Sequence, residues 1–124
     1  ASGTQDDDYL EALDSALSTA FGHLPEADVA FYLAGADPWG GDRLGRLALT
    51  KAGLLARDEL ILDRLVRAGV PVCVVLAGGY ADDVRDTVDI NAATATAVAS
   101  RLGDVTPRPG GTPAANLDAA ARHE

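Results

Sequence analysis

The sequence is poor in the residues that build disulfides and metal sites, with one cysteine, two histidines and no methionine. The single cysteine, Cys73, excludes an intrachain disulfide framework and a cysteine-rich zinc site. Its place inside an apolar run predicts a buried and unreactive thiol. His23 and His123 are isolated and lack the spacing of a metal motif. Because translation starts at methionine, we expect that residue 1 is not a translation start.

Basic residues and long apolar stretches are also scarce. Ten lysines and arginines stand against 19 aspartates and glutamates, which gives a net charge of −9. This balance argues against direct nucleic-acid binding, because phosphate contacts need clustered basic side chains. No apolar run is long enough to cross a bilayer, and no signal-peptide pattern opens the chain. Together these absences predict a cytoplasmic protein without nucleic-acid or membrane partners.

What the sequence does contain is the pattern of one α/β domain. Its 124 residues are 48% apolar and 23% charged, which is typical of a single globular core. Apolar residues recur at helical spacing in three segments and run continuously in two short ones. The predicted order is helix 9–21, strand 29–35, helix 51–68, strand 71–77 and helix 84–102. A proline- and glycine-rich stretch, 104–124, is predicted to be a flexible tail after a domain at 1–103.

Several local signals refine this order. The aspartates at 6–8 favour the start of the first helix, with Asp as its cap, and Thr50 caps the second. Gly69 ends the second helix. The unbroken apolar strands predict burial on both faces of a parallel sheet. Inside the second helix, Arg57 and Asp58 are interpreted as a surface ion pair.

A strand, a helix and a second strand form a βαβ unit with parallel strands. Asp37 follows the carboxyl end of the first strand, and Tyr80 follows that of the second. Ligands of open α/β sheets bind at this edge. The topology alone therefore places Asp37 and Tyr80 on one rim.

The rim residues admit more than one interpretation. Asp37 suits either a metal ligand or an Asx-turn. Gly78 and Gly79 let the backbone approach a bound group. Tyr80 suits either an oxyanion donor or an aromatic ring packed on a helix start. Asp42 and Arg43, in the loop after Asp37, suit a solvated turn pair.

Taken in order, these segments resemble the C-terminal half of the histone deacetylase superfamily. The GDRLG form at 41–45 is most similar to class IV or bacterial class IV-like deacetylases. The resemblance covers about residues 3–102. The segments that carry it are 3–10 (GTQDDDYL), 31–38 (FYLAGADP), 41–45 (GDRLG), 53–58 (GLLARD) and 70–81 (VPVCVVLAGGYA).

The resemblance implies a three-layer αβα fold with a parallel sheet, of the arginase and deacetylase type, present here as a C-terminal partial domain. It implies zinc-dependent hydrolysis of acetyl-lysine or a related acylated amine. Asp37 matches the last zinc ligand, and Tyr80 matches the tyrosine that stabilises the oxyanion. Gly78 and Gly79 match the glycines of the pocket wall. Asp42 and Arg43 fall at the pocket mouth or behind the ligands.

The sequence departs from the family pattern where most of the catalytic chemistry lies. The family uses a tandem histidine pair and an Asp-x-His motif, and this sequence contains neither. One carboxylate is a poor zinc site on its own, since catalytic zinc takes three protein ligands. We therefore expect a chain that is inactive alone and needs the N-terminal half of the domain. The alternatives are a degenerate, non-catalytic α/β binding module and one half of a two-chain deacetylase.

Overall fold

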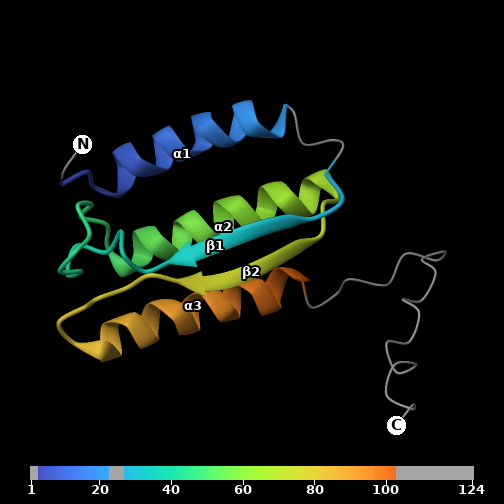
Figure 1. Cartoon of the computed structure of the whole chain (residues 1–124). Helices are drawn as coiled ribbons and strands as arrows, with labels where there is room; N and C mark the ends of the chain where they lie inside the picture. The colour runs from blue at the N-terminus through green and yellow to red at the C-terminus, as the bar shows by residue number, and fades with distance from the viewer. Residues whose placement is uncertain (1–2, 23–26, 103–124) are drawn as a thin grey trace, which may run out of the picture.

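The computed structural model describes residues 3–22 and 27–102. It contains helix α1 (Asp6–Phe21), strand β1 (Ala30–Gly35), helix α2 (Lys51–Ala68), strand β2 (Val72–Ala77) and helix α3 (Val84–Leu102), as Figure 1 shows. The predicted element order is confirmed. The predicted tail, its boundary at residue 103 and both histidines lie outside the described residues. Within the described ranges, no helix has the length and apolar character of a membrane span.

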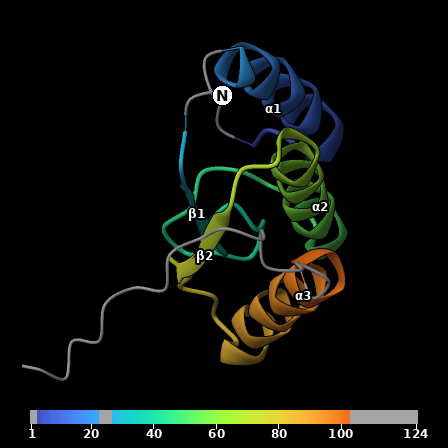
Figure 2. The same cartoon turned by 90° about the vertical axis from the view of Figure 1, so that its right-hand side faces the viewer.

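The two strands form a parallel pair in register from Ala30 opposite Val72 to Gly35 opposite Ala77. The α/β class with a parallel sheet is therefore confirmed. Helices α1, α2 and α3 lie in a row on one side of this sheet, with α2 in the middle (Figure 2). The core under the helices contains Ala36, Leu49, Leu54 and Ile90.

The opposite face of the sheet is open. Phe31 is 67% exposed, Leu33 is 65% exposed and Val75 is 42% exposed. Cys73 is exposed on the same face, because the register sets it opposite Phe31. The predictions of strands buried on both faces and of a buried cysteine are therefore wrong for this chain. The unbroken apolar runs predict a covering layer on each face of the sheet. The described residues provide this layer on one face only.

Helix α2 begins and ends as predicted. The Thr50 hydroxyl accepts a hydrogen bond from the Gly53 N–H at 2.9 Å. At the other end, Gly69 adopts a left-handed conformation with φ of +67°, which glycine reaches without a Cβ clash. Thr50 and Gly69 therefore determine where α2, the helix that connects β1 to β2, begins and ends.

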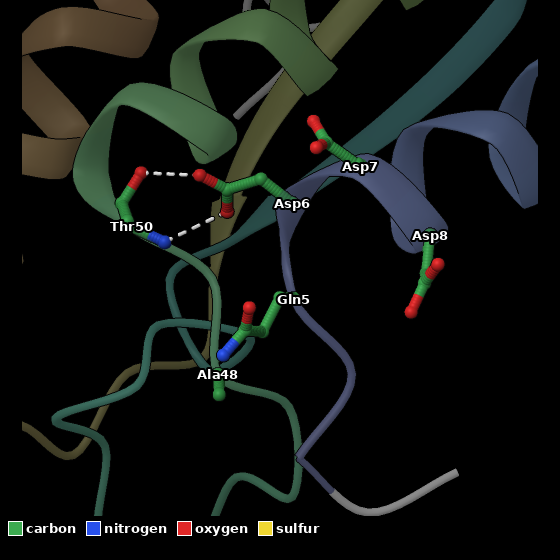
Figure 3. A pocket seen from close by; sticks show the side chains of 6 residues that line it. All are labelled: Gln5, Asp6, Asp7, Asp8, Ala48 and Thr50. Carbon is green, nitrogen blue, oxygen red and sulfur yellow. Dashed lines mark hydrogen bonds between the residues drawn. The ribbon is translucent and has the colours of Figure 1, made fainter.

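Helix α1 begins differently from the prediction, because its aspartates do not cap it. Its N-cap is Gln5, whose side chain makes no capping hydrogen bond. Asp6 instead reaches helix α2 and accepts from the Thr50 N–H at 2.9 Å and the Thr50 hydroxyl at 2.6 Å (Figure 3). A Cβ on Gly53 would lie 2.0 Å from the Asp6 carboxylate. Asp6 therefore joins the starts of two helices.

The acidic hollow around this contact does not gather its carboxylates at one point. Its lining consists of Gln5, Asp6, Asp7, Asp8, Ala48 and Thr50. Asp6 is hydrogen-bonded to Thr50, and the carboxylates of Asp7 and Asp8 lie apart from that of Asp6 (Figure 3). Across the residues that the structure describes, no group of three or more potential ligands is arranged to hold a metal ion.

Candidate functional site

The parallel pairing brings the ends of both strands to one edge. Beyond Gly35 and Ala77, the Ala36 N–H donates to the Ala77 carbonyl at 3.1 Å, which extends the pairing toward Asp37. The structure thus places Asp37 and the Gly78–Tyr80 loop on the same rim, as the topology predicted.

The Asp37 carboxylate lies between two glycines. A Cβ on Gly35 would lie 2.3 Å from Asp37 Oδ1, and one on Gly78 would lie 2.5 Å from the same atom. Both distances are shorter than real Cβ contacts, so a side chain at either position would displace the Asp37 carboxylate. Gly78 also has a φ of +63°, a backbone conformation that side chains disfavour. Sequence reasoning had singled out Gly78 but missed the matching role of Gly35.

The second loop glycine contacts the helical layer. A Cβ on Gly79 would lie 3.1 Å from the Ala36 side chain and 3.1 Å from Thr87 Cγ2, and its φ is +125°. Gly79 therefore lets the Tyr80 loop lie close to the start of α3. It shapes the backbone path of the rim, whereas Gly78 makes room for the Asp37 carboxylate.

Asp37 does not form an Asx-turn. Among the described residues, none donates a hydrogen bond to its exposed carboxylate. The Asx-turn of this loop belongs to Asp42, whose Oδ1 accepts from the Leu44 and Gly45 N–H groups at 2.8 Å each. The Asp37 carboxylate therefore has its oxygen atoms available for a ligand.

Asp42 also joins the two loops of the rim. Its second carboxylate oxygen accepts from the Tyr80 N–H, and its backbone forms an isolated antiparallel bridge with Ala81. Arg43 donates from its backbone N–H at 3.2 Å and from Nε at 3.3 Å to the Tyr80 carbonyl. Asp42 and Arg43 thus hold the Tyr80 backbone from both sides, and we call these contacts the Tyr80 clamp. The prediction of an exposed turn pair is thus right for the turn and for Arg43, which is 61% exposed, but it did not include the contacts with Tyr80.

The Tyr80 side chain extends from this fixed backbone into solvent. It is 57% exposed, so it is not an aromatic ring packed on the start of α3. A rigid backbone with a free phenol suits a hydrogen-bond donor for a ligand at the rim.

Charge strengthens the Tyr80 clamp at neutral pH. Burial disfavours the charged Asp42 carboxylate, but hydrogen bonds from the Tyr80, Gly45 and Leu44 backbones outweigh this, and the pKa falls below its ordinary 3.8. A carboxyl group whose pKa is lowered by folding contributes stability above its unfolded pKa. That contribution is lost as the pH falls through the folded pKa. We therefore expect Asp42 to stay charged at neutral pH and its contact with the Tyr80 N–H to weaken only in acid below pH 3.8.

The clamp can be tested by one isosteric change. In Asp42→Asn, one acceptor remains and an NH₂ group is available to face the Tyr80 N–H donor. Loss of a hydrogen bond to a charged group is worth about 1.5–3 kcal/mol. We therefore expect amide hydrogen exchange at Tyr80 to accelerate at least about tenfold. Asp82→Asn is the control, because among the described residues the Asp82 carboxylate meets Arg43 alone, at 3.5 Å and on the surface, where ion pairs are weak. Equal Tyr80 exchange rates in the two variants would argue against the clamp.

Behind the rim lies a buried charge cluster that corrects the surface interpretation of Arg57 and Asp58. Arg57 is 4% exposed and Asp58 is 1% exposed. Arg57 Nε donates to Asp58 Oδ1 at 2.9 Å, and Thr94 of α3 donates to Asp58 Oδ2 at 2.5 Å. The Tyr32 hydroxyl of β1 donates to Asp58 as well. Burial raises the pKa of Tyr32, so it donates as a neutral phenol.

The sequence did carry a signal for this burial. Leu54, Asp58, Leu62 and Leu65 recur at steps of four, four and three, and all are buried. Asp58 therefore lies on the apolar stripe of α2 and not on its solvent face. A charged residue at such a position predicts a buried partner.

An open cleft connects this cluster to the rim. It lies beside β1 and is lined by Tyr9, Tyr32, Gly35, Asp37, Arg57 and Ile61, among others. Burial raises the pKa of the Tyr9 hydroxyl, with the Asp58 and Asp37 carboxylates as further causes and Arg57 acting in the opposite direction. The cleft thus places a cation and two phenols beside the Asp37 carboxylate.

The structure is thus an α/β protein with a free carboxylate and a tyrosine at the carboxyl edge of its parallel strands, the edge where open α/β sheets bind ligands. The model of the histone deacetylase domain matches residues 1–97. The chain therefore belongs to the histone deacetylase domain family. This result agrees with the resemblance of the rim motifs.

Two relatives illustrate how the match is distributed. An uncharacterized protein of Picosynechococcus sp. is 43% identical over 86 residues, which are 69% of this chain and 28% of that protein. Histone deacetylase 2 of Arabidopsis thaliana is 35% identical over 79 residues, which are 64% of this chain and 20% of that protein. The chain thus spans less than a third of the length of these relatives.

Proposed function

We propose that this chain provides the carboxylate ligand and the oxyanion donor of a zinc-dependent deacetylase that acts on acetyl-lysine or a related acylated amine. The observation that carries the proposal is the Asp37 carboxylate, which lies free of hydrogen bonds from the described residues between Gly35 and Gly78. Carboxylate oxygen is a suitable zinc ligand. Family membership supplies the reaction class.

The residues of this chain have distinct roles in the proposed reaction. When bound, zinc polarises the acyl carbonyl and lowers the pKa of a water molecule. Asp37 binds the metal through its carboxylate. Tyr80 donates its phenol O–H to the acyl oxygen, where negative charge develops as the amide carbon becomes tetrahedral. Asp42 and Arg43 hold the Tyr80 backbone in place, so that only rotation of the side chain moves the phenol.

The described residues do not complete a zinc site. Asp37 is one ligand, whereas catalytic zinc takes three, and no cluster of three is present in the described ranges. We infer that the N-terminal part of the domain, or a separate chain equivalent to it, provides the other ligands and the histidine acid and base. We infer that it docks on the open face of the sheet, where Phe31, Leu33 and Val75 are exposed.

This inference predicts the behaviour of the chain when it is produced alone. We expect it to self-associate and to bind a hydrophobic dye, because an apolar sheet face and two unpaired strand edges are exposed. The double variant Phe31→Ser, Leu33→Ser is expected to reduce self-association and to weaken assembly with the rest of the domain. Sedimentation velocity measures both effects. A wild-type monomer with a cooperative melt at high temperature would contradict the expectation.

The proposed activity is tested on the assembled protein. We expect one zinc per assembly and turnover of an acetyl-lysine peptide that stops when a chelator removes the metal. An assembled, folded protein that binds no zinc and shows no turnover would point to the non-catalytic binding module instead. The low histidine content of this chain is the observation that keeps this second candidate open.

A further inference from the structure

The buried cluster around Arg57 requires an explanation other than stability. Burying two charges is expensive, and replacing a buried ion pair by apolar residues is often neutral or stabilising. Arg57 and Asp58 are nevertheless among the most buried residues of the described chain, at 4% and 1% exposure. Their contacts join β1, α2 and α3 through Tyr32 and Thr94.

One contact of the cluster points toward the rim. Arg57 Nη1 donates to the Gly35 carbonyl at 2.6 Å. Gly35 is the last residue of β1 and lies two residues before Asp37, and its Cα faces the Asp37 carboxylate closely enough to exclude a side chain. The guanidinium therefore fixes the peptide from which the carboxylate loop starts.

Asp58 fixes the guanidinium in turn. Its Oδ1 accepts from Arg57 Nε at 2.9 Å and lies 2.7 Å from Nη2 as an ion pair, although Nη2 makes no hydrogen bond among the described residues. Asp58 therefore holds the Nε–Nη2 edge of the guanidinium, while Nη1 reaches Gly35. Arginine suits this task, because its planar, rigid fork binds two partners in set directions. The arrangement links the helical layer to the end of β1.

We propose that Arg57, oriented by Asp58, is a positioning residue that sets the affinity of the rim for zinc through the Gly35 carbonyl and the Asp37 carboxylate. The proposal rests on the proposed function, because it takes Asp37 as a zinc ligand. Groups that orient a metal ligand from behind typically change metal affinity about 10–100-fold when they are removed. The Tyr80 side of the rim is held separately by Asp42, so it should remain intact.

The experiment compares Arg57→Met, Arg57→Lys and Leu62→Ala in the assembled protein. Leu62 is fully buried on the same helix, so its truncation destabilises α2 without touching Gly35. Three quantities are measured: zinc Kd by competition with a chelator, kcat and KM at saturating zinc, and the melting temperature. We expect Arg57→Met to raise the zinc Kd about 10–100-fold, an effect larger than its effect on kcat at saturating zinc. Leu62→Ala should lower the melting temperature and leave the zinc Kd unchanged.

Arg57→Lys keeps the buried charge and one donor, and it is expected to restore part of the zinc affinity. If Arg57→Met does not fold, the zinc Kd of Arg57→Lys tests the proposal in its place. A wild-type zinc Kd in a folded Arg57 variant overturns the proposal. The proposal is also overturned if Leu62→Ala weakens zinc binding in proportion to its loss of melting temperature, because zinc affinity would then depend on stability alone. If the wild-type assembly binds no zinc and shows no turnover, the proposed function itself fails, and the positioning proposal fails with it.

Discussion

Replacing Tyr80 with phenylalanine is expected to lower kcat of the assembled deacetylase about 100- to 1,000-fold, with zinc content unchanged. The change removes only the phenol oxygen, which is the proposed donor to the developing oxyanion. The side chain is 57% exposed, and the Tyr80 clamp contacts the backbone alone. Folding and metal binding should therefore not change. Steady-state kinetics on an acetyl-lysine peptide, with zinc analysis, measures the effect.

Tyr32→Phe is the matched control, because it removes the same atom from a buried site. The Tyr32 hydroxyl donates to Asp58, so its loss should lower the melting temperature and leave kcat at saturating zinc near wild type. A Tyr80→Phe variant with wild-type kcat would exclude Tyr80 from the reaction. A parallel loss of zinc and activity would show that Tyr80 is structural.

Replacing Asp37 with alanine is expected to remove both zinc and turnover. Loss of a direct ligand should weaken zinc binding by more than the roughly 10–100-fold typical of a group behind the ligands. The carboxylate accepts no hydrogen bond from the described residues, so the melting temperature measured without metal should not fall. Zinc titration and thermal melting, each on metal-free protein, test these two statements separately.

Asp82→Ala is the control for this change, since its side chain is 84% exposed on the same edge of the molecule. It should keep both zinc and turnover. Stoichiometric zinc at wild-type affinity in Asp37→Ala would refute the ligand assignment. A large loss of stability without metal would indicate that the carboxylate serves the fold instead.

Local signals in the sequence predicted much of this structure. Thr50 and Gly69 mark the two ends of α2, and the βαβ order alone predicts that Asp37 and Tyr80 lie at one edge. These features depend on short-range spacing and on the handedness of the crossover. They are readable because each is encoded within a few residues.

The contacts that were missed join residues far apart in sequence. Asp6 binds Thr50, and Arg57 binds the Gly35 carbonyl. Hydrophobic periodicity shows which face of a helix is buried, but not which polar group it meets there. The open sheet face is different, because the two strands taken alone predict exposed apolar faces and unpaired edges. An apolar strand does not specify which chain covers such a face.

The shared edge has a thermodynamic consequence. Asp37 and Tyr80 follow different strands, and they meet only because β1 and β2 pair. A ligand that contacts both residues therefore acts as a reversible cross-link between the strands. By linkage, a ligand at 100 times its Kd adds about 2.7 kcal/mol to the free energy of unfolding. Slower amide exchange along β1 and β2 would then report occupancy of the rim, without any measurement of catalysis.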